Sequence, residues 1–227
     1  MTSTVGVIGL GAMGSGMARS LRRHGCHVHV FDVRAEVAQA FAEEGGVACA
    51  SPVELAGQCD IIVSVVVNAA QTESVLFGEG GCASAMKRGS VFVMCSTVDP
   101  NWSIALQARL AALGILYLDA PISGGAAKAA SGEMTMMTSG TPEAYAAVGA
   151  LLDAMAGKVY RLGDAAGAGS KVKIINQLLA GVHIAAAAEA MALGLREGVD
   201  PAALYEVITH SAGNSWMFEN RMAHVLA

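Results

Sequence analysis

A glycine turn between two apolar segments lies near the start of the chain, and it restricts the possible folds more than any other feature. Residues 5–8 are apolar and mostly β-branched, which is typical of a buried strand. The pattern G-x-G-x-x-G follows over 9–14, a helix is expected over 13–24, and 27–31 alternate as a second strand that ends at Asp32. Strand, glycine turn, helix, strand and acid together predict a complete βαβ unit.

The spacing of these glycines suits a bound dinucleotide. Gly9 permits the tight turn, Gly11 lets a pyrophosphate approach the backbone, and Gly14 lets the helix pack against the strand. Asp32 can accept hydrogen bonds from a ribose diol and would repel a 2′-phosphate, so NAD is favoured over NADP, although Arg34 lies close by. The predicted cofactor residues of the turn are Gly9, Leu10, Gly11, Ala12, Met13 and Gly14.

Two alternatives exist for the same stretch. The glycines could form a turn without a nucleotide, or an S-adenosylmethionine site. His24, Cys26, His27 and His29 could bind a metal, but alternation along the strand places Cys26 on the face opposite His27 and His29, so the ligands would diverge. We therefore expect no metal site.

Strands alternate with helices up to residue 163, which predicts an α/β fold with a Rossmann-type doubly wound sheet. Further strands are expected over 60–67, 90–97, 115–121, 133–140 and 159–163. Helices are expected from Ser51, where Glu54 completes a capping box, and over 71–77, 82–87, 100–113 and 141–156.

Beyond residue 163 the pattern predicts helices only. A glycine-rich joint at 164–170 precedes helices expected over 169–197, 201–210 and from 215 onward. We therefore predict two domains, an NAD-binding domain at 1–165 and an all-helical domain at 166–227.

Composition limits the partners. Apolar residues make up 54% of the chain and charged residues 15%, which indicates a large core or a buried subunit interface. The net charge is −5, without a basic stripe, so we expect no nucleic-acid partner. Residues 174–195 are apolar enough to imitate a membrane span, but they include His183 and Glu189, so we expect a helix buried in protein and no membrane.

The cysteines and the first residues indicate a cytoplasmic protein. Five cysteines are scattered without a C-x-x-C pair, which is typical of reduced thiols. Residues 1–4 lead almost directly into a strand and do not resemble a targeting leader.

A second candidate site follows the strand at 115–121, because ligands of open α/β sheets bind at strand ends. The sequence DAPISGG over 119–125 offers the Ser123 hydroxyl and the amides of Gly124 and Gly125, which could hold a carboxylate. An ordinary glycine turn is the alternative.

The long predicted helix offers a base. Lys173, Asn176 and Gln177 are spaced i, i+3 and i+4 and share one face, whereas Lys171 points roughly the opposite way. Burial lowers a lysine pKa toward neutrality, which suits proton transfer. Alternatively, Lys173 extends its ammonium to solvent from the first turn of the helix.

Three segments resemble the β-hydroxyacid dehydrogenases, the 3-hydroxyisobutyrate dehydrogenase-like family. They are GVIGLGAMG, DAPISGG with GEMT after it, and GAGSKVKIINQ. The resemblance covers essentially the whole chain. The segments VVVNAAQ, NQLLAGVHIAAAAEAMAL and SAGNSWMFENRM are most similar to the four-carbon sugar-acid branch, the L-threonate dehydrogenases.

The resemblance implies roles for individual residues. Lys173 would be the catalytic acid/base that takes the hydroxyl proton of the substrate. Ser123, Gly124 and Gly125 would hold the carboxylate. The remaining implied substrate residues are Asn176, Gln177 and Trp216, and the remaining cofactor residues are Val67 and Thr97.

The predicted function is therefore oxidation of a small hydroxy acid by NAD, with L-threonate oxidised at its 2-hydroxyl. The alternatives are a 3-hydroxyisobutyrate dehydrogenase, a tartronate semialdehyde reductase, or an NAD-binding fragment without turnover. Relatives extend further, so we expect the helical domain to be incomplete. Composition and family also predict a homodimer or homotetramer through the helical region.

Overall fold

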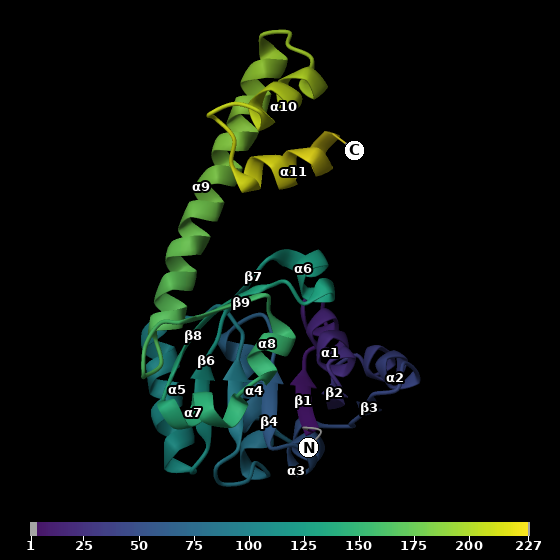
Figure 1. Ribbon diagram of the computed structural model, residues 1–227, viewed down its shortest axis with the longest axis vertical. Coiled ribbons are helices and arrows are strands. Elements are labelled where there is room, and N and C mark those ends of the chain that lie inside the picture. The colour runs from purple at the N-terminus through teal and green to yellow at the C-terminus, as the bar shows by residue number, and fades with distance from the viewer. Residues whose placement is uncertain (1–3, 227) are drawn as a thin grey trace. The chain divides into compact units, whose positions relative to one another are not determined.

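The computed structural model describes residues 4–226. Within these residues, nine strands form one sheet in the order β3-β2-β1-β4-β5-β6-β8-β7, with β9 pairing β8 (Figure 1). The strands from β3 to β6 pair in parallel, whereas β8 runs antiparallel to β6 and β7. The bounds are β1 Thr4–Ile8, β2 His27–Phe31, β3 Val47–Ala48, β4 Ile61–Ser64, β5 Val91–Met94, β6 Leu116–Asp119, β7 Ile122–Ser123, β8 Thr135–Gly140 and β9 Lys158–Arg161.

Helices pack on both faces of this sheet and form two separate cores. One core joins α1, α2 and α6 to α8 with the strands, and the other joins α3, α4 and α5. The predicted doubly wound Rossmann-type fold is therefore confirmed. The bounds are α1 Gly14–Arg23, α2 Ala35–Glu43, α3 Pro52–Gln58, α4 Ala69–Phe77, the short 3₁₀ turn Cys82–Ser84, α5 Pro100–Ala112, α6 Gly125–Ser131, α7 Pro142–Val148 and α8 Leu151–Met155.

Side-chain caps begin several of these helices. Ser51, Asp99, Thr141 and Asp200 each accept a hydrogen bond from a backbone amide of the first turn, and each precedes a proline. Proline suits the first helical position because its missing N–H would have no partner there. These helices begin where the sequence predicts.

Several elements differ from the prediction. The strand expected over 60–67 ends at Ser64, and the helix expected over 82–87 is only a 3₁₀ turn. The helix expected over 141–156 divides into α7 and α8, because Gly149 between them has a φ of 51°. The prediction also missed α2, α6, β3 and β7.

By internal contacts the chain divides into one unit up to Lys173 and a second from Ile174 onward. The second unit contains most of α9 (Ala168–Arg196) together with α10 (Pro201–Thr209) and α11 (Trp216–Leu226). The predicted domain boundary between 165 and 166 stays a prediction.

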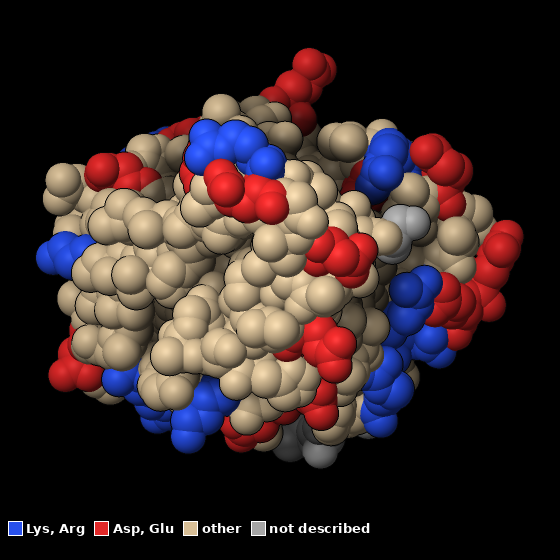
Figure 2. Space-filling view, turned by 90° about the horizontal axis from the view of Figure 1, so that it is seen from above, with Lys and Arg blue, Asp and Glu red and all other residues tan. Residues whose placement is uncertain are grey.

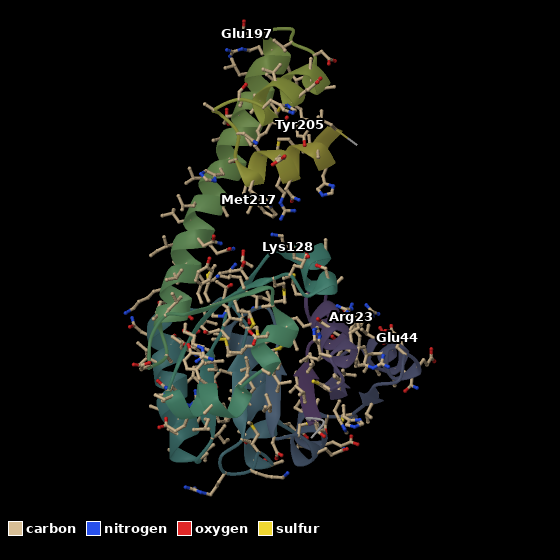
Figure 3. The ribbon with its side chains drawn as sticks, in the orientation of Figure 1. Arg23, Glu44, Lys128, Glu197, Tyr205 and Met217 are labelled. Carbon is tan, nitrogen blue, oxygen red and sulfur yellow. The ribbon has the colours of Figure 1, made fainter. Side chains whose placement is uncertain are left out.

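The second unit has a small core. Ala187, Met191, Phe218 and Met222 are its buried residues. Tyr205, which is labelled in Figure 3, belongs to this unit. It stacks on Phe218 with ring centroids 5.8 Å apart and donates a hydrogen bond to the Glu219 carbonyl oxygen.

Helix α9 is largely exposed, so the expectation that it is buried in protein is wrong for this chain. By length and composition it is the single helix among residues 4–226 that could cross a membrane, and only 17% of its most apolar 18-residue stretch is buried. The reason is that only Ala187 and Met191 of α9 enter the core of the second unit, whereas Leu178 and Leu195 are 66% and 58% exposed.

Charged side chains of both signs lie scattered over the molecular face shown in Figure 2, separated by broad uncharged areas. Only 15% of the residues are charged, and apolar side chains such as Leu178 and Leu195 make up part of the exposed surface.

Candidate active site

The glycine turn between β1 and α1 has the geometry that its spacing predicts. Gly9 has a φ of 91°, and a Cβ added there would lie 2.6 Å from the Val65 carbonyl oxygen. A Cβ on Gly14 would overlap the Gly9 carbonyl oxygen, so α1 can approach the turn only without a side chain there. A Cβ on Gly11 would meet nothing within 4 Å, which leaves open space beside the backbone.

Asp32 lies directly after β2 and is 7% exposed. Its carboxylate accepts hydrogen bonds from the amide of Leu10 at 2.7 Å, from the amide of Arg34 at 3.0 Å and from Arg34 Nε at 3.2 Å. Burial by itself would raise the pKa of Asp32, but these hydrogen bonds and the charge of Arg34 outweigh it and hold the pKa below its ordinary value. The carboxylate is therefore ionised at neutral pH.

A cavity of about 290 Å³ brings these elements together. Gly9, Gly11 and Asp32 line it, together with Arg34 and Val67. Val67, on the loop after β4, is 75% exposed. The cavity therefore collects predicted cofactor residues from three loops at the carboxyl ends of parallel strands, where Rossmann-type sheets bind ligands.

The start of α1 is open to an anion. Met13 occupies the N-cap position and makes no side-chain capping hydrogen bond. The Ser15 amide donates to the Gly11 carbonyl oxygen at 3.1 Å, whereas among residues 4–226 the amides of Gly14 and Gly16 have no hydrogen-bond partner. Together with the space beside Gly11, this fits the pyrophosphate of an NAD(P) molecule, with Asp32 placed for a ribose hydroxyl. Ala12 completes the turn, whereas Thr97 is exposed and does not line the cavity.

A hydroxyl pair that the sequence analysis missed supports the loop after β4. Ser96, which is 2% exposed, donates to the Val66 carbonyl oxygen at 2.7 Å and lies 3.2 Å from the Thr72 hydroxyl. Val66 lines the cavity, so this pair fixes one of its walls.

The segment after β6 turns sharply at two glycines. Gly124 and Gly125 have φ values of 138° and 78°, which other residues rarely adopt. The stem of Lys128 packs over Gly124, because a Cβ added at Gly124 would lie 3.0 Å from Lys128 Cβ. Within residues 4–226, neither these two amides nor the Ser123 hydroxyl makes a hydrogen bond, so all three donors can serve a ligand.

Lys173 is buried in the second turn of α9, with 7% of its surface exposed. Loss of solvent lowers its pKa from the ordinary value of 10.5. In the described part of the chain its ammonium makes no hydrogen bond or ion pair with a side chain. Lys171 is exposed, as expected for the opposite face.

The residues that follow Lys173 belong to the second unit. Asn176 is half-buried and Gln177 is exposed, and their amide groups lie 3.5 Å apart. Trp216 begins α11 and is 51% exposed.

The group that holds the start of α9 was not predicted from the sequence either. Asp119, the last residue of β6, is fully buried and accepts hydrogen bonds from the amides of Gly167 and Ser170, both at 2.9 Å, and from the Ser170 hydroxyl at 2.7 Å. An acid that ends an apolar strand was the available signal, but its partners lie about fifty residues further along the chain.

The histidine-rich strand β2 supplies no metal cluster in the described residues. Val28 and Val30 point into the core, whereas His27 is exposed and His29 is half-buried.

Two family models match the chain. One, described as the NAD-binding domain of 6-phosphogluconate dehydrogenase, matches residues 4–163. The other, described as the NAD-binding of NADP-dependent 3-hydroxyisobutyrate dehydrogenase, matches residues 167–227.

Similar proteins agree with these models. An L-threonate dehydrogenase of Cupriavidus necator is 67% identical over 226 residues, which are 100% of this chain and 76% of that protein. The crystal structure of a 3-hydroxyisobutyrate dehydrogenase from Salmonella typhimurium matches with a TM-score of 0.94 and 52% identity, covering 99% of this chain and 78% of that one. Psf3 in complex with NADP⁺ and 2-OPP matches with a TM-score of 0.90 and 28% identity, covering 98% and 78%.

The fold, the glycine turn and these matches define the class, which is that of the NAD(P)-binding hydroxyacid dehydrogenases. Within that class, the chain belongs to the 3-hydroxyisobutyrate dehydrogenase-like family, in the branch of the L-threonate dehydrogenases.

Proposed function

We propose that this chain oxidises the 2-hydroxyl of a four-carbon sugar acid, L-threonate, to a ketone, with NAD as the cofactor. The 67% identity to an L-threonate dehydrogenase supports the substrate. The observation that carries the mechanism is Lys173, a buried lysine without an ion-pair partner in the described residues, on a helix anchored at the carboxyl edge of the sheet.

The cofactor proposal rests on the cavity beside Asp32. Gly9, Gly11 and Gly14 would hold the pyrophosphate, and Asp32 would accept hydrogen bonds from the adenosine ribose. An ionised Asp32 would repel a 2′-phosphate, which favours NAD. The other proposed cofactor residues are Leu10, Ala12, Met13, Val67 and Thr97.

Lys173 would act as the acid/base. When bound, the oxidised dinucleotide supplies the hydride acceptor. The oxygen–hydrogen and carbon–hydrogen bonds of the substrate alcohol break, the carbonyl forms, and the proton passes to Lys173 Nζ. Burial lowers the pKa of Lys173 and thereby favours the neutral amine that this direction requires, and the ammonium would serve the reverse reduction.

The carboxylate of the substrate would bind to the Ser123 hydroxyl and to the amides of Gly124 and Gly125, the three free donors after β6. Asn176 and Gln177, one turn beyond Lys173 on the same helix, would orient the substrate. Trp216 would contribute a further contact.

A substrate panel tests the proposal. L-threonate and 3-hydroxyisobutyrate are offered with NAD and NADP in parallel, tartronate semialdehyde is offered with NADH, and the NADH absorbance is followed. The proposal expects the highest kcat/KM for L-threonate with NAD. Faster turnover of 3-hydroxyisobutyrate or tartronate semialdehyde would replace it with one of the alternatives, and NAD binding without any turnover would indicate a binding fragment.

We further propose a cytoplasmic homodimer or homotetramer that assembles through residues 166–227. The exposed apolar side chains of α9, such as Leu178, support this assembly. Light scattering at low micromolar concentration should give at least twice the chain mass, and a monomer would exclude it.

A further inference from the structure

The carboxylate of Asp119 is the most completely enclosed acid of the first unit. None of its surface is exposed, and four donors surround it. Oδ2 accepts from the amides of Gly167 and Ser170 at 2.9 Å and from the Ser139 hydroxyl at 3.2 Å. Oδ1 accepts from the Ser170 hydroxyl at 2.7 Å. Three of these four bonds come from the first turn of α9 or the residue before it.

A buried carboxylate requires compensation, because removing it from water is costly. Within residues 4–226, no lysine, arginine or histidine forms an ion pair with Asp119. The amides and the positive end of the α9 dipole take the place of a counter-ion. Helix α9 is 29 residues long, and the positive end of its dipole lies at its first turn. Electrostatic attraction to Asp119, as well as the hydrogen bonds, therefore holds this turn at the end of β6.

Two further contacts make this attachment close. Gly169 donates from its amide to the Ser139 hydroxyl at 2.9 Å, and that hydroxyl in turn donates to Asp119. A Cβ on Gly169 would overlap the Met137 carbonyl oxygen, so the helix lies directly against β8. Ser139 and Asp119 are partners in the β6–β8 pairing, so one rung of the sheet supplies both acceptors.

Lys173 lies on the same face of α9 as these anchors. It follows Gly169 by four residues and Ser170 by three, which are the helical neighbours on one face. Gly169, Ser170 and Lys173 are all buried, whereas Lys171 and Val172 between them are exposed. The anchored turn therefore fixes both the position of Lys173 along the helix axis and its orientation around that axis.

We infer that Asp119 is a positioning residue for the reaction: it locks the first turn of α9 and thereby holds the Lys173 amine in place. The inference rests on the proposed function, since it matters for catalysis only if Lys173 transfers the proton. Loss of the hydrogen bonds to Asp119 lets the start of the helix shift, and a displacement of about 1 Å can cost on the order of a hundredfold in rate.

The test compares Asp119→Asn and Ser170→Ala with two matched controls. Asp119→Asn keeps the size but loses the charge and one acceptor, and Ser170→Ala removes only the 2.7 Å bond. Thr138→Val and Ser20→Ala also remove buried hydroxyls that are hydrogen-bonded in the first unit, but those hydrogen bonds go to Tyr145, Tyr160 and Ala154 and not to Asp119 or α9.

We expect Asp119→Asn to lower kcat for L-threonate by roughly ten- to a hundredfold and Ser170→Ala by roughly three- to tenfold. The NAD dissociation constant should change by less than about twofold in both, because the cofactor residues are untouched. The controls should lose thermal stability but keep kcat. If Asp119→Asn does not fold, Ser170→Ala carries the comparison by itself.

A double-mutant cycle separates positioning from general destabilisation. In a Lys173→Met background, adding Asp119→Asn should lower the residual rate by less than about twofold, since no amine remains to be positioned. An equal loss in both backgrounds would overturn the inference, as would normal kcat in Asp119→Asn and Ser170→Ala. Normal turnover in Lys173→Met would instead contradict the proposed function.

Discussion

Helices α1 and α9 begin at the same edge of the sheet but differ in whether side chains of the chain hydrogen-bond to their first amides. Helix α1 follows β1, and Met13 at its N-cap makes no side-chain hydrogen bond. Helix α9 is attached to the end of β6, and the buried Asp119 accepts from the Gly167 and Ser170 amides. Both strands belong to the parallel part of the sheet, so their carboxyl ends lie at one edge.

The difference indicates which helix start is available to a ligand. An uncapped helix start beside open space at Gly11 can receive the phosphates of a mobile cofactor. At the start of α9 the amides of Gly167, Gly169 and Ser170 are already bonded to side chains of the sheet, so this start is less available to a ligand, but it gives a rigid base for a side chain one turn further on. The first arrangement suits binding, and the second suits the placement of Lys173.

Removing the Lys173 amine from α9 should have the largest effect on activity. We predict that Lys173→Met lowers kcat/KM for L-threonate oxidation by about a hundredfold or more, while the NAD dissociation constant stays within about twofold. Lys171→Met is the matched control, because Lys171 is exposed two residues away. Steady-state kinetics and nucleotide titration measure the two quantities, and equal rates in the two variants would end the assignment of Lys173.

Filling the space at the first helix should have the next largest effect. Gly11→Ala meets no atom of the chain within 4 Å, so we predict unchanged stability but NAD binding weakened by about tenfold or more, because the pyrophosphate needs that space. Gly57→Ala, at a helical glycine that is equally free of contacts, should leave NAD binding unchanged. Unaltered NAD affinity in Gly11→Ala would remove the turn from the cofactor site.

A smaller effect is expected at the ribose end of the same cavity. Asp32→Ser removes the carboxylate and releases Arg34 from its ion pair, so the ratio of kcat/KM with NAD to that with NADP should fall by about tenfold. Asp60→Ser, which removes an exposed carboxylate paired with Lys87, should not alter the ratio. The ratio is measured with both cofactors on one preparation, and no change at Asp32 would show that cofactor choice lies elsewhere.

The smallest predicted effect is on stability. Burial lowers the pKa of Lys173 in the folded chain, so the unfolded chain holds that proton more tightly at neutral pH and the charged lysine destabilises the fold. Lys173→Met should therefore raise the melting temperature by about 2–4 °C, corresponding to about 1 kcal/mol. Calorimetry can check this, and a lower melting temperature would mean that the ammonium has a stabilising partner.

The sequence predicted those parts of the fold that have local signals. The helices that follow Ser51, Thr141 and Asp200 were expected because a capping side chain and a proline mark each start, and the helix that begins at Pro100 was expected from its proline. Helices α2 and α6 were missed, and neither has a side-chain cap. The division of the 141–156 helix depends on a positive φ at Gly149, which the sequence alone does not specify.

The candidate site divides in the same way. The glycine turn and Asp32 lie within one βαβ unit, so their spacing along the chain is sufficient to predict their proximity. The Asp119 attachment was not predictable, because its partners Ser139 and Ser170 lie 20 and 51 residues away and only the folded sheet brings them together.

The pH dependence of kcat/KM for L-threonate oxidation tests the central claim most directly, namely that a buried amine at Lys173 takes the substrate proton. The neutral amine is the active form, so the rate should rise with pH through an acid limb whose apparent pKa lies below the ordinary lysine value of 10.5. That limb should be lost in Lys173→Met. An acid limb that survives unchanged in the variant would contradict the account.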